Sequence, residues 1–333
     1  MSEHASIYEH RVMVDERVGS GRNMTRVDIR RASARSLHDT WGGEYRMAPD
    51  PDKTVHKPRL LFRPDPVIGW SLSPDHAVQV RFRRNVLQTI DADGWRTLPK
   101  TTQPSGPRIA FYGCSFTYGT GLADDETYTA LLQSTYPNLR ILNRGIGGHG
   151  TTQNLMQFRR DVAAGAVDAA VFAMIGDHRF RNIAHPRRMR QYKARIWHLR
   201  GIEHVPVVRL DLSGAARIIY RPIWQPVIEQ ANFDIFLPDD YMTMRAMFAV
   251  IDLVQSVAAE AGVPVRFALL DQVDPRVNEA MMAEIPQLMD VSTPYDEIHY
   301  FLPNDTHPNA RSNRLFAERL SSVVEALAAG VGA

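Results

Sequence analysis

The sequence predicts an α/β fold: a three-layer α/β/α arrangement around a mostly parallel sheet, preceded by an N-terminal β-rich accessory region. From residue 106 to residue 333, short apolar runs alternate with stretches of helical periodicity. The run 169–175, AAVFAMI, is apolar throughout, as expected of a parallel strand covered on both faces. In residues 1–105, by contrast, short β-type runs are broken by Pro, Gly and Asp, which indicates the accessory region.

Within residues 1–105, the first 55 are polar and Arg-rich without a sustained period. They indicate an extension that is either disordered or draped over the core. The segments 60–82 and 85–95 carry residues typical of strands, broken by Pro, Gly and Asp. The segment 99–107, PKTTQPSGP, is typical of a linker, so we place the α/β domain at 106–333.

Strands and helices are predicted to alternate in the α/β domain. The predicted strands are 109–112, 139–142, 169–175 and 263–270, and the predicted helices are 127–136, 153–164, a long one starting near residue 244, and 309–327. Apolar residues recur at helical spacing in the long helix, from Met247 to Val257. Gly262 and Pro264 then end it in the usual C-terminal pattern.

Composition and charge exclude several classes of protein. Of the 333 residues, 44% are hydrophobic and 23% are charged, which is typical of a globular protein. The net charge of +2 predicts no nucleic-acid partner and no membrane partner. The single cysteine, Cys114, excludes an intrachain disulfide and a four-cysteine zinc site, and we expect no metal and no cofactor. The N-terminus lacks the apolar core of a signal peptide, and no run approaches the ~20 apolar residues of a membrane span, so we expect a cytoplasmic protein.

Ser115 is the first candidate for chemistry, in the stretch RIAFYGCSFTYGTG. It stands two residues after Gly113, where the first strand of the α/β domain is predicted to end. A loop at that place exposes side chains at the carboxyl edge of a parallel sheet, where the sites of such folds lie. Ser115 is therefore either a helix N-cap or a nucleophile. Its neighbour Cys114 is expected to be a small buried filler, with Cys114 as the nucleophile being the alternative.

Asp305 and His307 are the second candidate, in the loop that opens the last helix. Residues i and i+2 of an extended segment point the same way, so Asp305 can hold Nδ1 of His307 and leave Nε2 free as a base. A solvated capping loop is the alternative. Glu297 and His299 have the same spacing but lie upstream among apolar neighbours, and we therefore favour Asp305 and His307.

Two further loops follow predicted strands. The stretch LNRGIGGHG holds four glycines, which let a backbone approach a ligand and donate its amides, although an ordinary flexible turn is the alternative. The stretch MIGDHRFRN places His178 and Arg179 at the same edge of the sheet. Arg179, a candidate substrate-binding residue, opens a basic stretch that is usually a solvated face and less often binds an anion. The alternative for His178 is a solvated side chain beside a capping Asp177.

These four segments resemble the SGNH (GDSL-type) hydrolase family over residues 106–330. YGCSFTYGTGLADDETY resembles the family's first block, NRGIGGHG the second, IGDH the third and DTHPN the last, in the same order. The resemblance implies that Ser115 is the nucleophile, His307 the base and Asp305 the residue that orients the base. It also implies that the backbone amides of Ser115 and Gly148 donate to the oxyanion.

Two positions depart from the family pattern. His178 stands where the family has the Asn that is its third oxyanion donor, and Cys114 stands where the family has an Asp before the Ser. A ring nitrogen of His178 can still donate a hydrogen bond. The departures leave open whether the chain is a slow, specialised or inactive member of the family.

The resemblance implies a serine esterase that removes an acyl group, such as acetyl, from a carbohydrate or another polar alcohol. The expected partner is then a small-molecule or glycan ester. Two alternatives stay open, O-acyl transfer through the same Ser-His-Asp site and a non-catalytic glycan-binding module.

Overall fold

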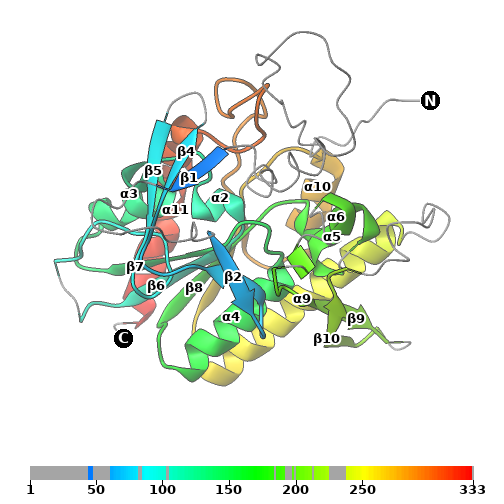
Figure 1. The fold of residues 1–333 in the computed structure, drawn as a ribbon. Coiled ribbons are helices and arrows are strands. Elements are labelled where there is room, and N and C mark those ends of the chain that lie inside the picture. The colour runs from blue at the N-terminus through cyan, green and yellow to red at the C-terminus, as the bar shows by residue number, and fades with distance from the viewer. Residues whose placement is uncertain are drawn as a thin grey trace, which may run out of the picture.

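A five-stranded parallel sheet forms the centre of the protein (Figure 1). Its strands are β6 (Arg108–Gly113), β7 (Arg140–Gly145), β8 (Ala169–Met174), β11 (Val265–Leu269) and β12 (Leu288–Asp290). Their order across the sheet is β12-β11-β8-β6-β7, and every neighbouring pair is parallel. The predicted α/β class with a mostly parallel sheet is confirmed.

The structure is a computed structural model, and it describes residues 44–47, 61–81, 85–102, 105–183, 185–191, 197–198, 200–211, 214–224 and 238–331. The extension predicted over residues 1–55 lies outside the described residues, except for 44–47. Residues 103–104 of the predicted linker, and 192–196 and 199 of the basic stretch, also lie outside them.

Both faces of the sheet are buried, because alternate residues of each strand enter different hydrophobic clusters. In β6, Ile109 and Phe111 belong to one cluster, whereas Ala110 and Tyr112 belong to the other. All positions of β8 are buried. The uniformly apolar sequence of β8 is what a strand covered on both faces requires.

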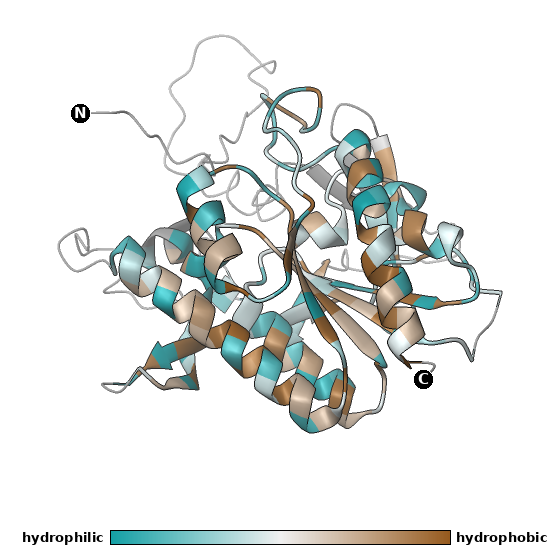
Figure 2. Cartoon of the chain, turned by 180° about the vertical axis from the view of Figure 1, so that it is seen from behind, coloured by the Kyte–Doolittle hydropathy of each residue, from teal (hydrophilic) through white to brown (hydrophobic). Residues whose placement is uncertain are grey.

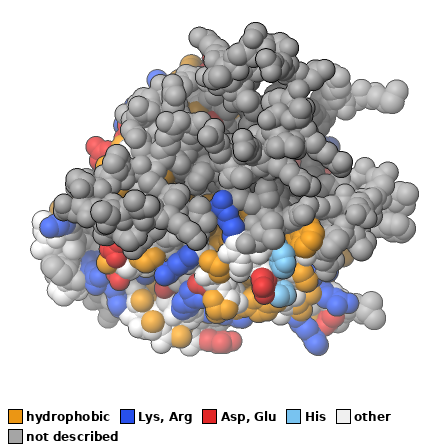
Figure 3. All heavy atoms as spheres, in the orientation of Figure 1, with side chains coloured by type: hydrophobic (Ala, Val, Ile, Leu, Met, Phe, Trp, Pro, Cys, Tyr) orange, Lys and Arg blue, Asp and Glu red, His pale blue; other side chains and the backbone are white. Residues whose placement is uncertain are grey.

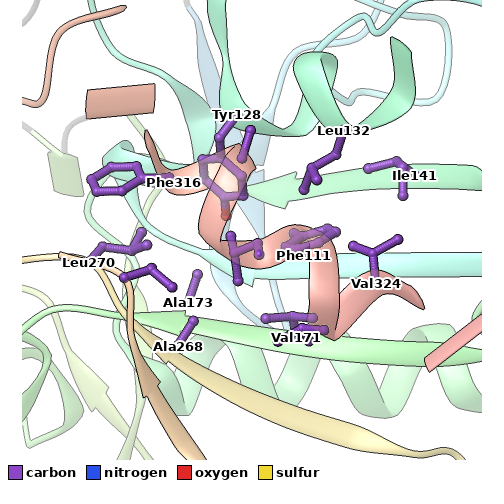
Figure 4. Packing of buried hydrophobic residues seen from close by; sticks show 14 of the residues in the cluster. Phe111, Tyr128, Leu132, Ile141, Val171, Ala173, Ala268, Leu270, Phe316 and Val324 are labelled. Atoms are coloured by element: carbon purple, nitrogen blue, oxygen red, sulfur yellow. The ribbon is translucent and has the colours of Figure 1, made fainter. Parts of the chain in front are cut away.

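Helices α3 (Tyr128–Thr135) and α11 (Ala310–Val331) cover one face of the sheet. On α11, Phe316, Leu320 and Val324 recur at helical spacing and pack with the side chains of β6 and β8. Figure 4 shows aromatic and branched side chains of these helices meeting residues of the strands. Thr127 starts α3 as an N-cap, since its side chain accepts a hydrogen bond from the backbone of Ala130.

Helices α4 (Thr151–Ala163), α9 (Asp240–Ala261) and α10 (Pro275–Glu284) cover the opposite face. α9 begins at Asp240, one turn before the predicted start, because Asp239 caps it by accepting the N–H of Met242 at 2.8 Å. It ends at Gly262, as predicted, with a left-handed φ of 66°. The three layers of the prediction are therefore present.

By length and composition alone, α9 is the one helix in the described part of the chain that is apolar enough to cross a membrane. Its side chains Met247, Val250, Ile251 and Val254 are buried against the sheet. Seen from behind, the covering helices alternate between hydrophobic and hydrophilic residues (Figure 2). This pattern is typical of a core helix with one solvent-facing side.

The N-terminal region is β-rich, as predicted. Its strands are β1 (Glu44–Met47), β2 (Phe62–Asp65), β3 (Gly69–Leu72), β4 (His76–Arg81) and β5 (Asn85–Ile90). They form the antiparallel sheet β1-β4-β5 and the antiparallel pair β2-β3. A third hydrophobic cluster packs Ile68 and Trp70 of this region against Tyr118 and Ile146 of the α/β part.

Several elements were not among those predicted. They are strand β12, the antiparallel hairpin of β9 (His204–Leu210) and β10 (Ala216–Pro222), the short helices α2 (Ser115–Tyr118), η2 (Asp124–Glu126), α5 (His178–Asn182) and α6 (Pro186–Gln191), and helix α10. The hairpin lies beside α4 and α9, at the lower right of Figure 1.

Candidate active site

The predicted site residues follow the carboxyl ends of the parallel strands. Ser115 comes after β6, Gly148 after β7, and His178 after β8. The chain leaves β6 toward β7 on one side and reaches β8 on the other, so the strand order reverses at β6. Open α/β sheets bind their ligands at such a reversal.

Two glycines let the turn that carries Ser115 lie directly on the strand ends. A Cβ atom at Gly113 would come within 2.8 Å of Thr117 Cβ, and one at Gly145 within 2.6 Å of the backbone carbon of Thr117. Neither contact is possible for a larger residue without moving α2. The chain therefore ends β6 at a glycine because α2 packs across it.

The side chain of Asn143 holds the turn that carries Ser115 in place. Its Nδ2 donates to the carbonyl of Thr117 at 2.8 Å and to Thr129 Oγ1 at 2.9 Å, while its Oδ1 accepts the N–H of Gly145 at 2.9 Å. All polar atoms of this buried side chain are thus used. The sequence predicts a role for the glycines of this loop, but it does not predict that the buried Asn143 holds the turn in place.

Ser115 is the first residue of α2 and is only 2% exposed. As a first helical residue, it has an N–H without a partner inside the helix. Its neighbour Cys114 is fully buried and belongs to the core cluster beneath α3 and α11. The expectation that Cys114 is a buried filler is confirmed. Its packing in the hydrophobic core argues against Cys114 as the nucleophile.

Asp305 and His307 form the predicted pair. Nδ1 of His307 lies 2.5 Å from Oδ1 of Asp305, and the same oxygen accepts the backbone N–H of His307 at 2.8 Å. Both side chains are buried, at 2% and 3% exposure. A carboxylate beside Nδ1 holds the proton there, which is the tautomer in which Nε2 can act as a base.

Phe116 brings this pair to the strand end that carries Ser115. Its ring centroid lies 5.7 Å from that of His307. Ser115 directly precedes Phe116, so the first and last segments of the family resemblance meet although almost 200 positions separate them. The structure therefore brings Ser115, Asp305 and His307 into one region of the carboxyl edge.

In the alternative pair, Glu297 and His299, the histidine bonds a different carboxylate. His299 instead places Nδ1 2.8 Å from Oδ1 of Asp296, three residues earlier. Asp296 is exposed, and its pKa is lowered chiefly by the hydrogen bond from His299. Asp296 and His299 form a turn before the last helix, which favours the predicted assignment of the base to His307.

The loop that carries Gly148 is held by the N-terminal region. Trp70 Nε1 donates to the carbonyl of Gly147 at 3.0 Å, and the carbonyl of Trp70 lies 3.0 Å from His149 Nε2. Gln153 adds a bond from Nε2 to the carbonyl of Ile68 at 2.7 Å. Gly148 itself has a φ of 80°, which favours glycine. The loop is therefore clamped by β3 rather than being a flexible turn.

His178 is fully buried, so the alternative of a solvated side chain is wrong. Its Nδ1 lies 3.1 Å from Oγ1 of Thr151, just after the Gly148 loop, and its Nε2 has no hydrogen-bond partner among the residues that the structure describes. Burial, followed by the charge of Arg181, lowers the pKa of His178 well below its usual value. A neutral ring with one unused nitrogen beside the Gly148 loop is compatible with the predicted donor role, which stays a prediction.

Arg179 is also buried, and it lies between two helices. Its guanidinium is 3.4 Å from a carboxylate oxygen of Asp240 on α9 and 3.6 Å from one of Asp274 before α10. It also stacks over the ring of Phe180 at 4.4 Å. These contacts favour a structural role, and substrate binding by Arg179 stays a prediction.

A buried ionic cluster joins the second and third segments. Arg181 donates from Nε to Asp177 at 2.7 Å and from Nη1 to the carbonyl of His149 at 2.9 Å. Burial opposes ionisation of Asp177, but the charges of Arg188 and Arg181 outweigh it and lower its pKa to about 2. Asp177 is therefore an ionised anchor, not the helix cap considered as its alternative, since its side chain makes no cap hydrogen bond.

Asp271 is a buried carboxylate at this edge that the prediction did not include. It follows β11, and its Oδ1 accepts the N–H of Gly176 at 3.0 Å. Burial raises the pKa of Tyr295 to about 12, and the nearby carboxylates of Asp305 and Asp271 add to this effect. An acid directly after an apolar strand, as in VRFALLD, is the sequence signal that marks this position.

Two cavities of the described residues lie away from Ser115 and His307. One, of about 550 Å³, is lined by uncharged residues around the start of β11, at the opposite edge of the sheet. The other, of about 790 Å³, lies between the β9–β10 hairpin and α9. Within the described ranges, no cluster of His, Cys, Asp and Glu side chains is suited to hold a metal ion.

No family model matches this sequence, and no curated protein matches it. Several solved structures do match. A member of the lipolytic G-D-S-L family from Veillonella parvula is 16% identical with a TM-score of 0.39, over 66% of this chain and 99% of its own. The psychrotrophic esterase EstA from Pseudoalteromonas sp. is 12% identical with a TM-score of 0.37, over 66% of this chain and 97% of its own.

A two-domain esterase active on acetylated mannans is 15% identical with a TM-score of 0.37, over 67% of this chain and 50% of its own. GDSL-type lipolytic proteins and esterases are thus among the solved structures that this chain resembles. Because the likeness is distant, the function of this chain rests on its own residues.

Proposed function

We propose that this protein is a serine esterase, in which Ser115 attacks an acyl ester and His307 is the general base. The observation that carries the proposal is the buried Asp305–His307 pair, whose imidazole contacts Phe116, the residue after Ser115. A serine at the exit of a central strand with an oriented histidine beside it is the arrangement that acyl transfer requires.

In the proposed reaction, Nε2 of His307 accepts the proton of Ser115 while Oγ attacks the carbonyl carbon of the ester. The carbonyl oxygen becomes an oxyanion, toward which the N–H groups of Ser115 and Gly148 donate. Collapse of this intermediate breaks the ester C–O bond, and the departing alcohol takes the proton from His307. His307 then accepts a proton from water as the water attacks the acyl-enzyme, the carboxylic acid leaves, and the proton returns from His307 to Oγ of Ser115. Asp305 orients the ring of His307 and stabilises the imidazolium that forms.

For the substrate class, we propose a short acyl ester, such as acetate, of a carbohydrate or another polar alcohol. The likeness to an esterase active on acetylated mannans accords with this proposal without deciding it. Two buried polar atoms near the carboxyl edge, Nε2 of His178 and Oδ1 of Asn278, have no hydrogen-bond partner among the described residues. Buried polar groups of this kind suit a substrate with hydroxyl groups.

The test is turnover of p-nitrophenyl acetate by the wild type and by Ser115→Ala. We expect the variant to lose at least about three orders of magnitude in kcat, because the nucleophile acts as a unit with its base. Its thermal unfolding should be unchanged, since Ser115 Oγ supports no core packing. A variant with near-wild-type turnover would show that Ser115 is not the nucleophile.

A further inference from the structure

The cavity between the hairpin and α9 is lined by an unusual set of charges. Its described lining includes Arg209 on β9, Arg217 on β10 and Arg245 on α9. Asp211 is the one acidic residue of this lining. We call this space, of about 790 Å³, the arginine cavity. Figure 3 shows one face of the protein, on which Lys and Arg side chains lie among hydrophobic ones.

Arg209 and Arg217 stand directly opposite each other across the two strands of the hairpin. Like charges in that position destabilise a pair of strands. Among the described residues, neither Arg209 nor Arg245 has an ion-pair partner. Arg217 lies 3.8 Å from Asp211, but its side chain is 77% exposed, so the interaction is weak. The hairpin thus carries a repulsion that an external anion would relieve.

Asp211 offsets only one of the three arginine charges of the lining. Its Oδ1 accepts the N–H of Ala215 at 3.0 Å. The turn also brings the third arginine close, since a Cβ atom at Gly214 would lie 3.2 Å from Nη2 of Arg245. Gly214 has a φ of 84°, so a glycine suits both its conformation and this close approach. Guanidinium groups from two strands and a helix therefore line one space.

An aromatic ring lies beside these charges. Tyr241 lines the cavity and is 67% exposed, and Met242 next to it is 46% exposed. Guanidinium groups bind carboxylate and sulfate groups through paired hydrogen bonds, and an exposed tyrosine offers an apolar face with a polar tip. An acidic sugar presents the same combination, an apolar ring face and an oxyanion. We infer that the arginine cavity binds an anionic oligosaccharide through carboxylate or sulfate groups.

The first turn of α9 lines the cavity and also pairs with the residue next to His178. Asp240, which precedes Tyr241, pairs with Arg179, and Arg179 follows His178 at the end of β8. The inference deepens the proposed function by naming acidic glycans as the substrate class, and in that respect it rests on it. Binding to a nucleic acid is less favoured, because the lining offers a single exposed aromatic residue and the chain carries a net charge of only +2.

The test is a binding measurement on the full chain carrying Ser115→Ala, so that no ester is turned over. Isothermal titration would compare an oligogalacturonate, its neutral methyl ester, a sulfated oligosaccharide of the same length and a DNA duplex. We expect an acidic oligosaccharide to bind at least about tenfold more tightly than the methyl ester. The carboxylated and sulfated arms then identify which oxyanion the cavity prefers.

Arg209→Gln and Arg245→Gln should each weaken binding of the acidic oligosaccharide about five- to tenfold, because each removes a charge-assisted contact. Arg314→Gln, at an exposed arginine of α11, is the matched control and should change nothing. Without ligand, Arg209→Gln should unfold at the same or a higher temperature, since it removes the repulsion across the hairpin.

The inference would be overturned if neither acidic oligosaccharide bound, if the methyl ester bound equally well, or if the variants kept full affinity. DNA binding as tight as that of the acidic oligosaccharides would also overturn it. Failure of the proposed function has a different signature, namely unchanged ester turnover by Ser115→Ala. The two hypotheses can therefore fail separately.

Discussion

Trp70→Phe tests whether the N-terminal region positions the proposed oxyanion donor. Trp70 Nε1 donates to the carbonyl of Gly147, and that carbonyl shares a planar peptide unit with the N–H of Gly148. The indole hydrogen bond therefore fixes the direction in which the Gly148 N–H points. In the variant, the Gly147 carbonyl stays buried without this donor, and the peptide unit becomes free to rotate.

The cost can be estimated from the contacts that are lost. An unsatisfied buried carbonyl costs about 1–3 kcal/mol, and the space left by the smaller ring brings the loss to about 2–4 kcal/mol in free energy of unfolding. Complete loss of one oxyanion donor lowers kcat by about 10²–10³-fold. Because rotation of the peptide unit disorders the donor without removing it, we expect kcat to fall about 10- to 100-fold and KM to change less than about threefold.

The assay is p-nitrophenyl acetate hydrolysis, with chemical denaturation measured in parallel. Trp95→Phe is the matched control, because the Trp95 ring packs in the same cluster and under Arg144 at 4.2 Å without bonding the Gly148 loop. It should lose stability while keeping kcat. Equal kcat values for Trp70→Phe and the wild type would refute the idea that this hydrogen bond orients the donor.

Three further predictions concern histidines. His307→Ala should abolish esterase turnover, whereas His299→Ala should mainly lower the unfolding temperature; the reverse result would move the base to His299. His178→Ala should lower kcat more than it raises KM, and His178→Asn should restore part of the loss, since its amide can donate to the oxyanion; an alanine variant with unchanged kcat would remove His178 from the site. Acid should destabilise the fold, because burial lowers the pKa of His149 to about 3 and that of His178 well below its usual value. The stability that comes from keeping each buried histidine neutral is present above about pH 6.5 and is lost as the pH falls. At pH 5.5 the loss in free energy of unfolding is about 1.4 kcal/mol per histidine, which denaturation curves at pH 7.5 and 5.5 would detect.

The sheet could be predicted because its central strands are continuous apolar runs, each followed by a helix of clear periodicity. β12 could not, since Leu288–Asp290 is too short to give an apolar run. The β9–β10 hairpin does carry a signal, HVPVVRL and ARIIYRP around a turn with a glycine, which is typical of paired strands. The start of α9 is set by the side chain of Asp239, a cap that precedes any apolar periodicity.

The candidate site divides in a similar way. The contact between Asp305 and His307 could be predicted, because residues i and i+2 of an extended segment point the same way. The catalytic roles of Ser115, Asp305 and His307 stay predictions. The residues that hold the site in shape could not be predicted, because their partners are distant in the sequence. The position of Asp271 after an apolar strand is a signal, but its bond to Gly176 leaves no pattern in a single sequence, and neither does the bond of Trp70 to Gly147. The clamp on the Gly148 loop emerges only from the packing of the N-terminal region.

The clamp on the Gly148 loop also affects the order of folding. Trp70 and Gly147 are 77 positions apart, and Gln153 and Ile68 are 85 apart, so these contacts close long loops of chain. Contacts of such separation are costly to form early and are usually completed late in folding. During refolding, helical and strand signals would then return before ester turnover does. Recovery of enzymatic activity would then report when the N-terminal region docks on the Gly148 loop.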